Sequence, residues 1–494
     1  MINNIYKNKK ICYQKGIILV NVLVFMVIAI ALVTVYITWV SASVKLAKTT
    51  IDKEQALQIA ESGIDYYRWH LAHAANDFQD GTNTNGPYTH IFYDKDGNAI
   101  GNFILTITPP IVGSTIVTVR SEGHVNDYPS IKRTIQVKLA IPSFAKFAIV
   151  ADDVMRFGQG TEVFGPIHSN QGIRFDGIAH NIVTSAVSSY EDPDHSGSNE
   201  FGVHTHVNAS NGTVDDSFRP LEAPPNPVQT RSDVFLAGRQ FPVPQADFTG
   251  ITNSLSVIKT NAQSGGKYLA PSGALGYHIV LKTNDTYDVY KVNSLTSASS
   301  SCSYDSNSGD STWGTWSIAT GGESFLANYA NPANGLIFVE DNVWVDGQIN
   351  TARITIAAGK FPDNVSTRKN IFINKDLRYT NYDGTDVIGL ISQNDVSVGM
   401  VSNDTIRIDA ALMAINGQVG RHYYANSCSP YDDRTQITLY GMIGSNERYG
   451  FAYTDGTGYN IRTIIYDANL LYGPPVSFPL TSDKYSTISW DEIE

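Results

Sequence analysis

An uncharged apolar run near the N-terminus is the strongest constraint on this chain. Residues 17–40 read IILVNVLVFMVIAIALVTVYITWV, with no charged residue, proline or glycine. As a helix, these 24 residues would rise about 36 Å, enough to cross the ~30 Å hydrocarbon core of a bilayer. The residues before the run include Lys7, Lys9, Lys10 and Lys15 but no acid. The positive-inside bias therefore predicts a single-pass membrane protein with a cytoplasmic N-terminus and an exported C-terminal domain.

Three kinds of segment fit this run. A secretory signal peptide could be cleaved near Val40-Ser41-Ala42, although such peptides usually have only about 7–15 apolar residues. A signal anchor would keep the run as a permanent transmembrane helix. A type IV prepilin is the third, because a basic leader ends in Lys15-Gly16 and the apolar residues begin directly at Ile17.

Lys15, Gly16 and Ile17 resemble the processing site of type IV pilins and pseudopilins. The resemblance implies that residues 1–16 are a leader, that a prepilin peptidase cuts after Gly16, and that Ile17 is then methylated. It also implies two further partners: other pilin subunits and an inner-membrane assembly platform. A formal net charge of −12 argues against nucleic acid as a partner.

Asn21 departs from the pattern of that family. The fifth mature residue of a pilin is normally a Glu that pairs with the N-terminal amine of the neighbouring subunit, and this chain has Asn21 there. An amide can hydrogen-bond to a buried ammonium but cannot neutralise it. Loss of the Glu is seen in subunits at the filament tip, so the resemblance implies a minor, tip-located pilin. Residues 56–64 also look like the N-terminal region of PilX-type minor pilins.

The apolar helix is expected to continue beyond the membrane. In residues 41–76 an apolar stripe recurs at spacings of 3, 4, 3 and 4, which predicts an amphipathic helix. Residues 88–142 then alternate with period two between turns near 95–98, 109–113 and 126–129, which predicts an antiparallel meander of four strands within residues 77–143. A helix followed by such a meander is a pilin-like α+β module. The stripe consists of Leu57, Ala60, Ile64, Tyr67 and Leu71.

The remaining residues are predicted to be mainly β. Short apolar runs with Asn or Asp turns begin at Gly165, Gly335, Gly389, Ala411 and Gly441. Each has the composition of one rung of a parallel β-solenoid, or β-helix. We therefore expect a solenoid in residues 144–182 and 331–494, with a β-sandwich as the alternative. Residues 335–347 resemble the C-terminal region attached to PilX-like proteins.

Residues 183–330 are expected to be an insertion into this solenoid. The segment 186–227 is polar and ends in a proline-rich linker at 219–227. Residues 246–264 could form a short helix. Residues 276–292 predict a hairpin that turns at Asn284-Asp285.

The three cysteines lie on both sides of the proposed cleavage site. Cys12 lies in the leader, so processing leaves Cys302 and Cys428. An exported chain with two thiols usually pairs them. The sequence therefore predicts a disulfide between the insertion and the solenoid.

A histidine pair has the composition of a metal site. His204 and His206 alternate along the chain near His195, Asp192 and Asp194, and alternate residues of a strand point the same way. The spacing places no strong third ligand. We therefore expect no metal and no cofactor, with His204 and His206 as weak candidates.

The chain shows no motif for catalysis. We find no nucleophile elbow, phosphate loop, zinc-protease helix or paired carboxylates in a recognisable context. Asp152-Asp153 and the pair Arg407/Asp409 fall on expected solenoid rungs, where polysaccharide lyases carry acidic and basic residues. Outward-facing charges on a solenoid are ordinary, so we do not expect an enzyme.

Together these features predict a minor, tip-located type IV pilus subunit that acts in pilus assembly and surface adhesion. After assembly its β-rich head would lie at the cell surface and contact a surface glycan or protein. The alternatives are a pseudopilin of type II secretion, a permanently anchored β-helix adhesin and, less favoured, a glycan-degrading enzyme.

Overall fold

The computed structural model describes most of the chain as two compact units. The described residues are 14–111, 113–194, 197, 199–248, 251–302, 314–481 and 484–493, so most of the expected leader lies outside them. The N-terminal unit comprises Met1–Thr108, Thr118–Lys138 and Ser489–Glu494. The β-rich unit comprises Pro109–Val117 and Leu139–Ile488.

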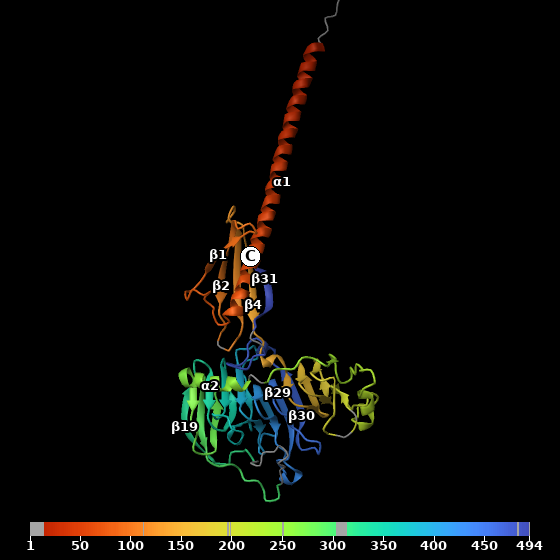
Figure 1. Ribbon diagram of the computed structural model, residues 1–494, viewed down its shortest axis with the longest axis vertical. Coiled ribbons are helices and arrows are strands. Elements are labelled where there is room, and N and C mark those ends of the chain that lie inside the picture. Colours follow the sequence, from red (N-terminus) through yellow and green to blue (C-terminus); the bar gives the residue numbers. More distant parts are fainter. Residues whose placement is uncertain are drawn as a thin grey trace, which may run out of the picture. The chain divides into compact units, whose positions relative to one another are not determined.

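Helix α1 (Gln14–His73) runs without a break through the expected membrane segment and the expected amphipathic segment (Figure 1). Among the described residues it is the one helix long and apolar enough to cross a bilayer. Its first half is apolar on all sides, and Leu19 and Phe25 are 69% and 71% exposed in the single chain. In its second half the expected stripe is confirmed: Leu57 is half-buried, and the other members are buried.

A sheet packs against the second half of α1. Its strand order is β1-β2-β3-β4-β31, with β1, β2 and β3 paired antiparallel. The first four strands are the expected meander. The fifth comes from the C-terminal end of the chain, which no local pattern signals. The bounds are β1 (Tyr88–Tyr93), β2 (Ala99–Thr108), β3 (Val117–Val125), β4 (Lys132–Ala140) and β31 (Ser486–Ile493).

Glycines allow α1 to lie close to this sheet. A Cβ atom at Gly123 of β3 would lie 2.3 Å from the carbonyl oxygen of Ala56. A Cβ atom at Gly63 of α1 would lie 2.3 Å from Oγ of Ser121. These separations are far below van der Waals contact, so any larger residue would force the helix and the sheet apart.

The β-rich unit consists mainly of parallel strands. In the described residues, the longest stack follows pairings in the order β16-β20-β22-β25-β27-β29-β5-β8-β11-β15. Its strands are β16 (Lys267–Leu269), β20 (Leu336–Val339), β22 (Arg353–Ala358), β25 (Val387–Ser392), β27 (Thr405–Ala414), β29 (Asp433–Ser445), β5 (Ile149–Ala151), β8 (Ile167–Ser169), β11 (Val183–Ser185) and β15 (Arg239–Gln240).

Further parallel stacks contain the other strands of this unit. One runs β17 (Gly276–Leu281), β21 (Val343–Gln348), β23 (Ile371–Phe372), β26 (Val396–Val398) and β28 (Val419–Arg421). Another links β21 through β24 (Leu377–Arg378), β27 and β29 to β30 (Gly458–Tyr466), β7 (Thr161–Phe164) and β10 (Ile178–Ala179). In Figure 1, β29 and β30 lie side by side in blue.

Short elements complete the β-rich unit. A separate sheet contains β6 (Met155–Phe157), β9 (Ile173–Phe175) and β14 (Val203–His204), and β12 (Ser189–Tyr190) pairs with β13 (Glu200–Phe201). β18 (Thr286–Val292) and β19 (Glu323–Ala330) extend β17 antiparallel. The helices are α2 (Ile251–Gly265), η1 (Phe144–Lys146), η2 (Asp216–Glu222), η3 (Val365–Thr367), η4 (Asn426–Cys428) and η5 (Ala468–Leu471).

A ladder of buried aliphatic side chains runs along the longest stack. The parallel register aligns one position of each strand with one position of the next, and each of these aligned positions has an aliphatic residue. Each aliphatic side chain therefore packs on the next one along the stack. Full burial of such a side chain stabilises the fold by about 2 kcal/mol. The ladder is Ile337, Ile356, Leu390, Leu412, Ile443, Ile149, Ile167 and Val183.

Residues 183–330, expected as an insertion, contribute strands to the stacks. β11 and β15 lie at one end of the longest stack and β16 at the other. The chain between β15 and β16 therefore returns along the stack, and α2 buries Leu255, Ile258 and Ala262 against Leu336 and Phe338 on the way. The expected helix in 246–264 is thus found as α2.

The expected hairpin in 276–292 is also present. It is formed by β17 and β18, and Asp285 at its turn has a φ of 59°. An Asp or Asn tolerates this left-handed conformation better than most residues do.

His278 of β17 joins this hairpin to its neighbours. Its Nδ1 lies 2.6 Å from Glu323 Oε2 on β19, and its Nε2 lies 2.9 Å from Asp346 Oδ2 on β21. The residue is only 4% exposed. Burial lowers the pKa of His278, but the hydrogen bonds and charges of the two carboxylates outweigh burial and raise the pKa to about 9.

We expect the stability of the β-rich unit to fall as the pH rises through 9. A raised pKa in the folded state adds stability that is complete below the unfolded value of about 6.5 and disappears above the folded value. The free energy of unfolding should fall by up to about 3 kcal/mol between pH 6.5 and 10. In urea unfolding of the full chain, His278→Gln should flatten this profile and the partly exposed His180→Gln should not. If the free energy of unfolding of the wild type and of His278→Gln changes with pH in the same way, His278 is not the cause of the loss of stability.

Candidate functional site

The expected processing residues lie at the start of α1. Lys15, Gly16 and Ile17 fall in the first turn of this helix, and Ile17 is exposed in the single chain. Asn21 follows Ile17 by four residues, so the two residues lie on the same helix face. The cut after Gly16 and the role of Asn21 stay predictions.

The two cysteines that remain after the expected cleavage are disulfide-bonded. Cys302 and Cys428 are joined across 126 residues. Cys428 lies in η4 and is buried with Met400 and Tyr424, and Cys302 packs against this cluster. The bond ties the segment that follows the β17–β18 hairpin to η4, as the sequence predicts.

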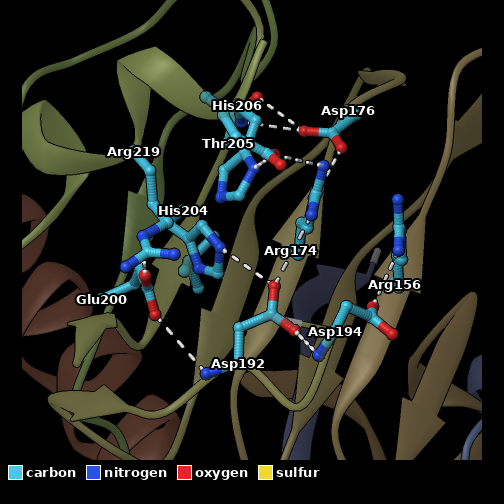
Figure 2. Close-up of polar contacts among 12 residues, drawn as sticks. Arg156, Arg174, Asp176, Asp192, Asp194, Glu200, His204, Thr205, His206 and Arg219 are labelled. Carbon is cyan, nitrogen blue, oxygen red and sulfur yellow. Dashed lines mark hydrogen bonds and ion pairs between the residues drawn. The ribbon is translucent and has the colours of Figure 1, made fainter. Parts of the chain in front are cut away.

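A second feature is a row of basic side chains on the sheet β6-β9-β14. Parallel register pairs Arg156 of β6 with Arg174 of β9, and Arg174 with His204 of β14. Carboxylates from the segment after β12 face this row, as Figure 2 shows. Asp194 Oδ2 lies 2.9 Å from Arg156 Nη1, and Asp192 Oδ2 lies 3.6 Å from His204 Nε2.

Asp176 holds the backbone at and just beyond the end of β14, which carries the two histidines. Its Oδ2 accepts a hydrogen bond from Arg174 Nε at 2.7 Å. Its Oδ1 accepts from the backbone N–H of His206 at 2.8 Å and from the hydroxyl of Thr205 at 3.3 Å. These contacts fix His204 and His206 relative to β9.

The two imidazoles lie in different electrostatic environments. His206 Nδ1 lies 2.8 Å from Asp216 Oδ1. Burial and the charge of Arg174 nevertheless lower the pKa of His206 to about 4, so its ring is neutral at neutral pH. His204 is 0% exposed, and neither of its ring nitrogens has a hydrogen-bond partner in the described residues. Burying unsatisfied nitrogens costs about 1–3 kcal/mol each.

The fold brings a third possible metal ligand, Asp192, close to the two histidines, which their spacing in the sequence did not predict. Ligand atoms of Asp192, His204 and His206 all lie within 4.8 Å of one another, and all three residues are buried. Asp194, which the sequence also placed nearby, pairs with Arg156 and Arg448. His195 lies outside the described residues.

The charged pairs considered for catalysis make structural contacts. Asp409 is fully buried and accepts hydrogen bonds from Arg407 Nε at 2.8 Å and from Tyr382 Oη at 2.7 Å. Asp152 accepts from the side chain of Asn170, and Asp153 accepts from the backbone N–H of Val154. These contacts are typical of ion pairs and turns that stabilise a fold. That the chain is not an enzyme stays a prediction.

Comparison with known proteins gives little on function. No family model matches this chain, and no curated protein does. Among solved structures, the competence-associated pilin ComZ from Thermus thermophilus is similar over 90% of this chain and 97% of its own, with 12% identity and a TM-score of 0.30. A TM-score of 0.30 does not establish a common fold.

Removing the disulfide should destabilise the β-rich unit. A covalent link across 126 residues restricts the unfolded chain, and loss of such a link typically costs about 2–4 kcal/mol. The double variant Cys302→Ser/Cys428→Ser should therefore unfold at lower urea, and reductant should shift the wild type by a similar amount. Cys12→Ser is the control and should unfold like the wild type. Two freely alkylated thiols among Cys302 and Cys428 in unreduced protein are the contrary result.

Proposed function

We propose that this chain is a minor, tip-located subunit of a type IV pilus that takes part in assembly and carries its β-rich unit as an adhesive head. The observation that carries this proposal is α1. This unbroken helix begins at the expected processing residues, exposes apolar side chains on all sides of its first half, and buries one stripe of its second half against a sheet. Such a helix can lie first in a membrane and then in the core of a filament.

Processing would convert the membrane protein into a filament subunit. A prepilin peptidase would cut after Gly16, and Ile17 would become the methylated N-terminal residue. The first half of α1 would leave the bilayer and pack against other pilin subunits at the inner-membrane platform. Its exposed apolar residues, such as Leu19 and Phe25, would then be buried against other subunits. Little apolar surface would therefore be exposed to water when the helix leaves the bilayer.

Asn21 supports a place at the tip. A subunit within the shaft would need a carboxylate at this position to neutralise the ammonium group of the next subunit, and an amide cannot do so. A tip subunit has only one neighbour along the axis. With no next subunit whose ammonium group must be neutralised, a tip subunit does not need a carboxylate at position 21.

The β-rich unit is suited to be a rigid head. We infer that its parallel stacks are the faces of a β-helix, which is supported by the aliphatic ladder from Ile337 to Val183 and by the parallel register of successive strands. Continuous backbone pairing along the stacks resists bending under load. The head would bind a surface glycan or protein, without catalysis.

The tip assignment predicts a change of position in the filament. The measurement is labelling of sheared filaments with an antibody against the β-rich unit. In filaments with the wild-type protein, the antibody should bind only at the filament ends. Asn21→Glu supplies the missing carboxylate and should move part of the label to internal positions. Asn21→Gln has the size of Glu without its charge and should label ends only. Label along the shaft in the wild type contradicts the tip position, and filaments without label contradict the proposed function.

A further inference from the structure

We propose that Asp192, His204 and His206 bind a divalent transition-metal cation such as Zn²⁺. This inference is independent of the proposed pilus function. Two imidazoles and one carboxylate are a common set of zinc ligands. Here they come from three points of one polar segment, namely the turn after β12, the end of β14, and the residue two positions beyond it.

The distances fit a site that needs only small side-chain rotations. The ligands of a tetrahedral zinc ion at about 2.0–2.1 Å lie about 3.3 Å from one another. His204 Nε2 and Asp192 Oδ2 are 3.6 Å apart, and the three groups lie within 4.8 Å. The imidazole rings of His204 and His206 have centroids 5.1 Å apart and lie one above the other in Figure 2, beside Asp192.

His204 is the group that points to a ligand. This side chain is 0% exposed, and neither ring nitrogen has a hydrogen-bond partner in the described residues. The ion-pair contact of Nε2 with Asp192 is too long to be a hydrogen bond. A cation on Nε2 would satisfy this nitrogen and bring the Asp192 carboxylate to bonding distance.

His206 already has the outer contact that metal-bound histidines usually have. Its Nδ1 lies 2.8 Å from the Asp216 carboxylate and therefore carries the proton, so the lone pair lies on Nε2. Asp216 has a side chain that is 70% exposed. The Nδ1 edge of His206 therefore lies next to a solvent-exposed carboxylate.

Arg174 is a cation that already lies beside these groups. Its closest contact is with Asp176, at 2.7 Å from Nε. Its other terminal nitrogens are 3.9 Å from Asp192 and 3.7 Å from Asp216, beyond hydrogen-bonding distance. Oδ1 of Asp192 accepts a hydrogen bond from the backbone N–H of Asp194 at 2.9 Å, and a second cation bound at Oδ2 would leave the Arg174–Asp176 pair intact. Glu200 and Arg219 neutralise each other at 2.8 Å.

Bound zinc would act as a staple in this part of the chain. Asp192 follows β12, whereas His204 belongs to the sheet β6-β9-β14. One ion would tie the residues just after β12 to that sheet, as the disulfide ties the segment after β18 to η4. Three protein ligands leave a fourth position for water or an oxygen ligand.

The test is a zinc titration of the full-length protein in detergent after removal of metals by chelation. We expect one equivalent of Zn²⁺ per chain, a higher temperature of unfolding with Zn²⁺ and no such effect with Mg²⁺. His204→Gln and His206→Gln should each weaken binding at least 100-fold. Asp216→Asn should weaken binding roughly 10–100-fold, as loss of an outer contact does. His180→Gln is the matched control and should bind as the wild type.

Co²⁺ provides a readout that does not depend on the fold of a variant. Wild-type protein with one equivalent of Co²⁺ should show the intense visible absorption of a four-coordinate ion with nitrogen and oxygen ligands. Absence of stoichiometric Zn²⁺ binding, an octahedral Co²⁺ spectrum, or unchanged affinity in a folded His204→Gln/His206→Gln double variant overturns the proposal.

Discussion

In a bilayer, the backbone of residues 17–40 could satisfy its hydrogen bonds only inside its own helix. In lipid no water or neighbouring strand is available to these N–H and C=O groups, so any break would cost several kilocalories per mole. The same helix continues to His73 and supplies the apolar stripe on which β1–β4 pack. Gly63 and Gly123 then set how closely helix and sheet approach. The N-terminal unit is thus organised around one helix that is long and apolar enough to cross a membrane.

The fold was predictable wherever the information is local. Period-two alternation and turn residues gave the four strands β1–β4, the 3-4-3-4 spacing gave the buried stripe of α1, and Asn284-Asp285 gave the hairpin. Pairings between distant segments were not visible, because they depend on register that only the folded chain provides. The addition of β31 beside β4 and the pairing of Ile443 with Ile149 are of this kind. For the same reason, residues 183–330 looked like an insertion although they supply strands to the stacks.

The candidate sites divide in the same way. The disulfide followed from counting cysteines in an exported chain, and the leader motif needs only adjacent residues. The histidine pair was visible from its alternation, but the spacing did not show which of His195, Asp192 and Asp194 would complete the group. Asp192 follows β12, and His204 lies in β14 just after β13. The antiparallel pairing of β12 with β13 brings these two parts of the chain together, and Asp176 binds the backbone at His206. β12 and β13 are only two residues long each, too short for a recognisable alternation in the sequence.

The most direct test of the account is the chemical state of the N-terminus. The protein should be isolated from membranes of cells with and without prepilin peptidase, and its N-terminal sequence and mass determined. The account predicts a chain that starts at methylated Ile17 when the peptidase is present and retains its leader when it is absent. An intact Met1 in both, or a start at Ser43, would contradict it and leave an anchored or secreted β-rich adhesin.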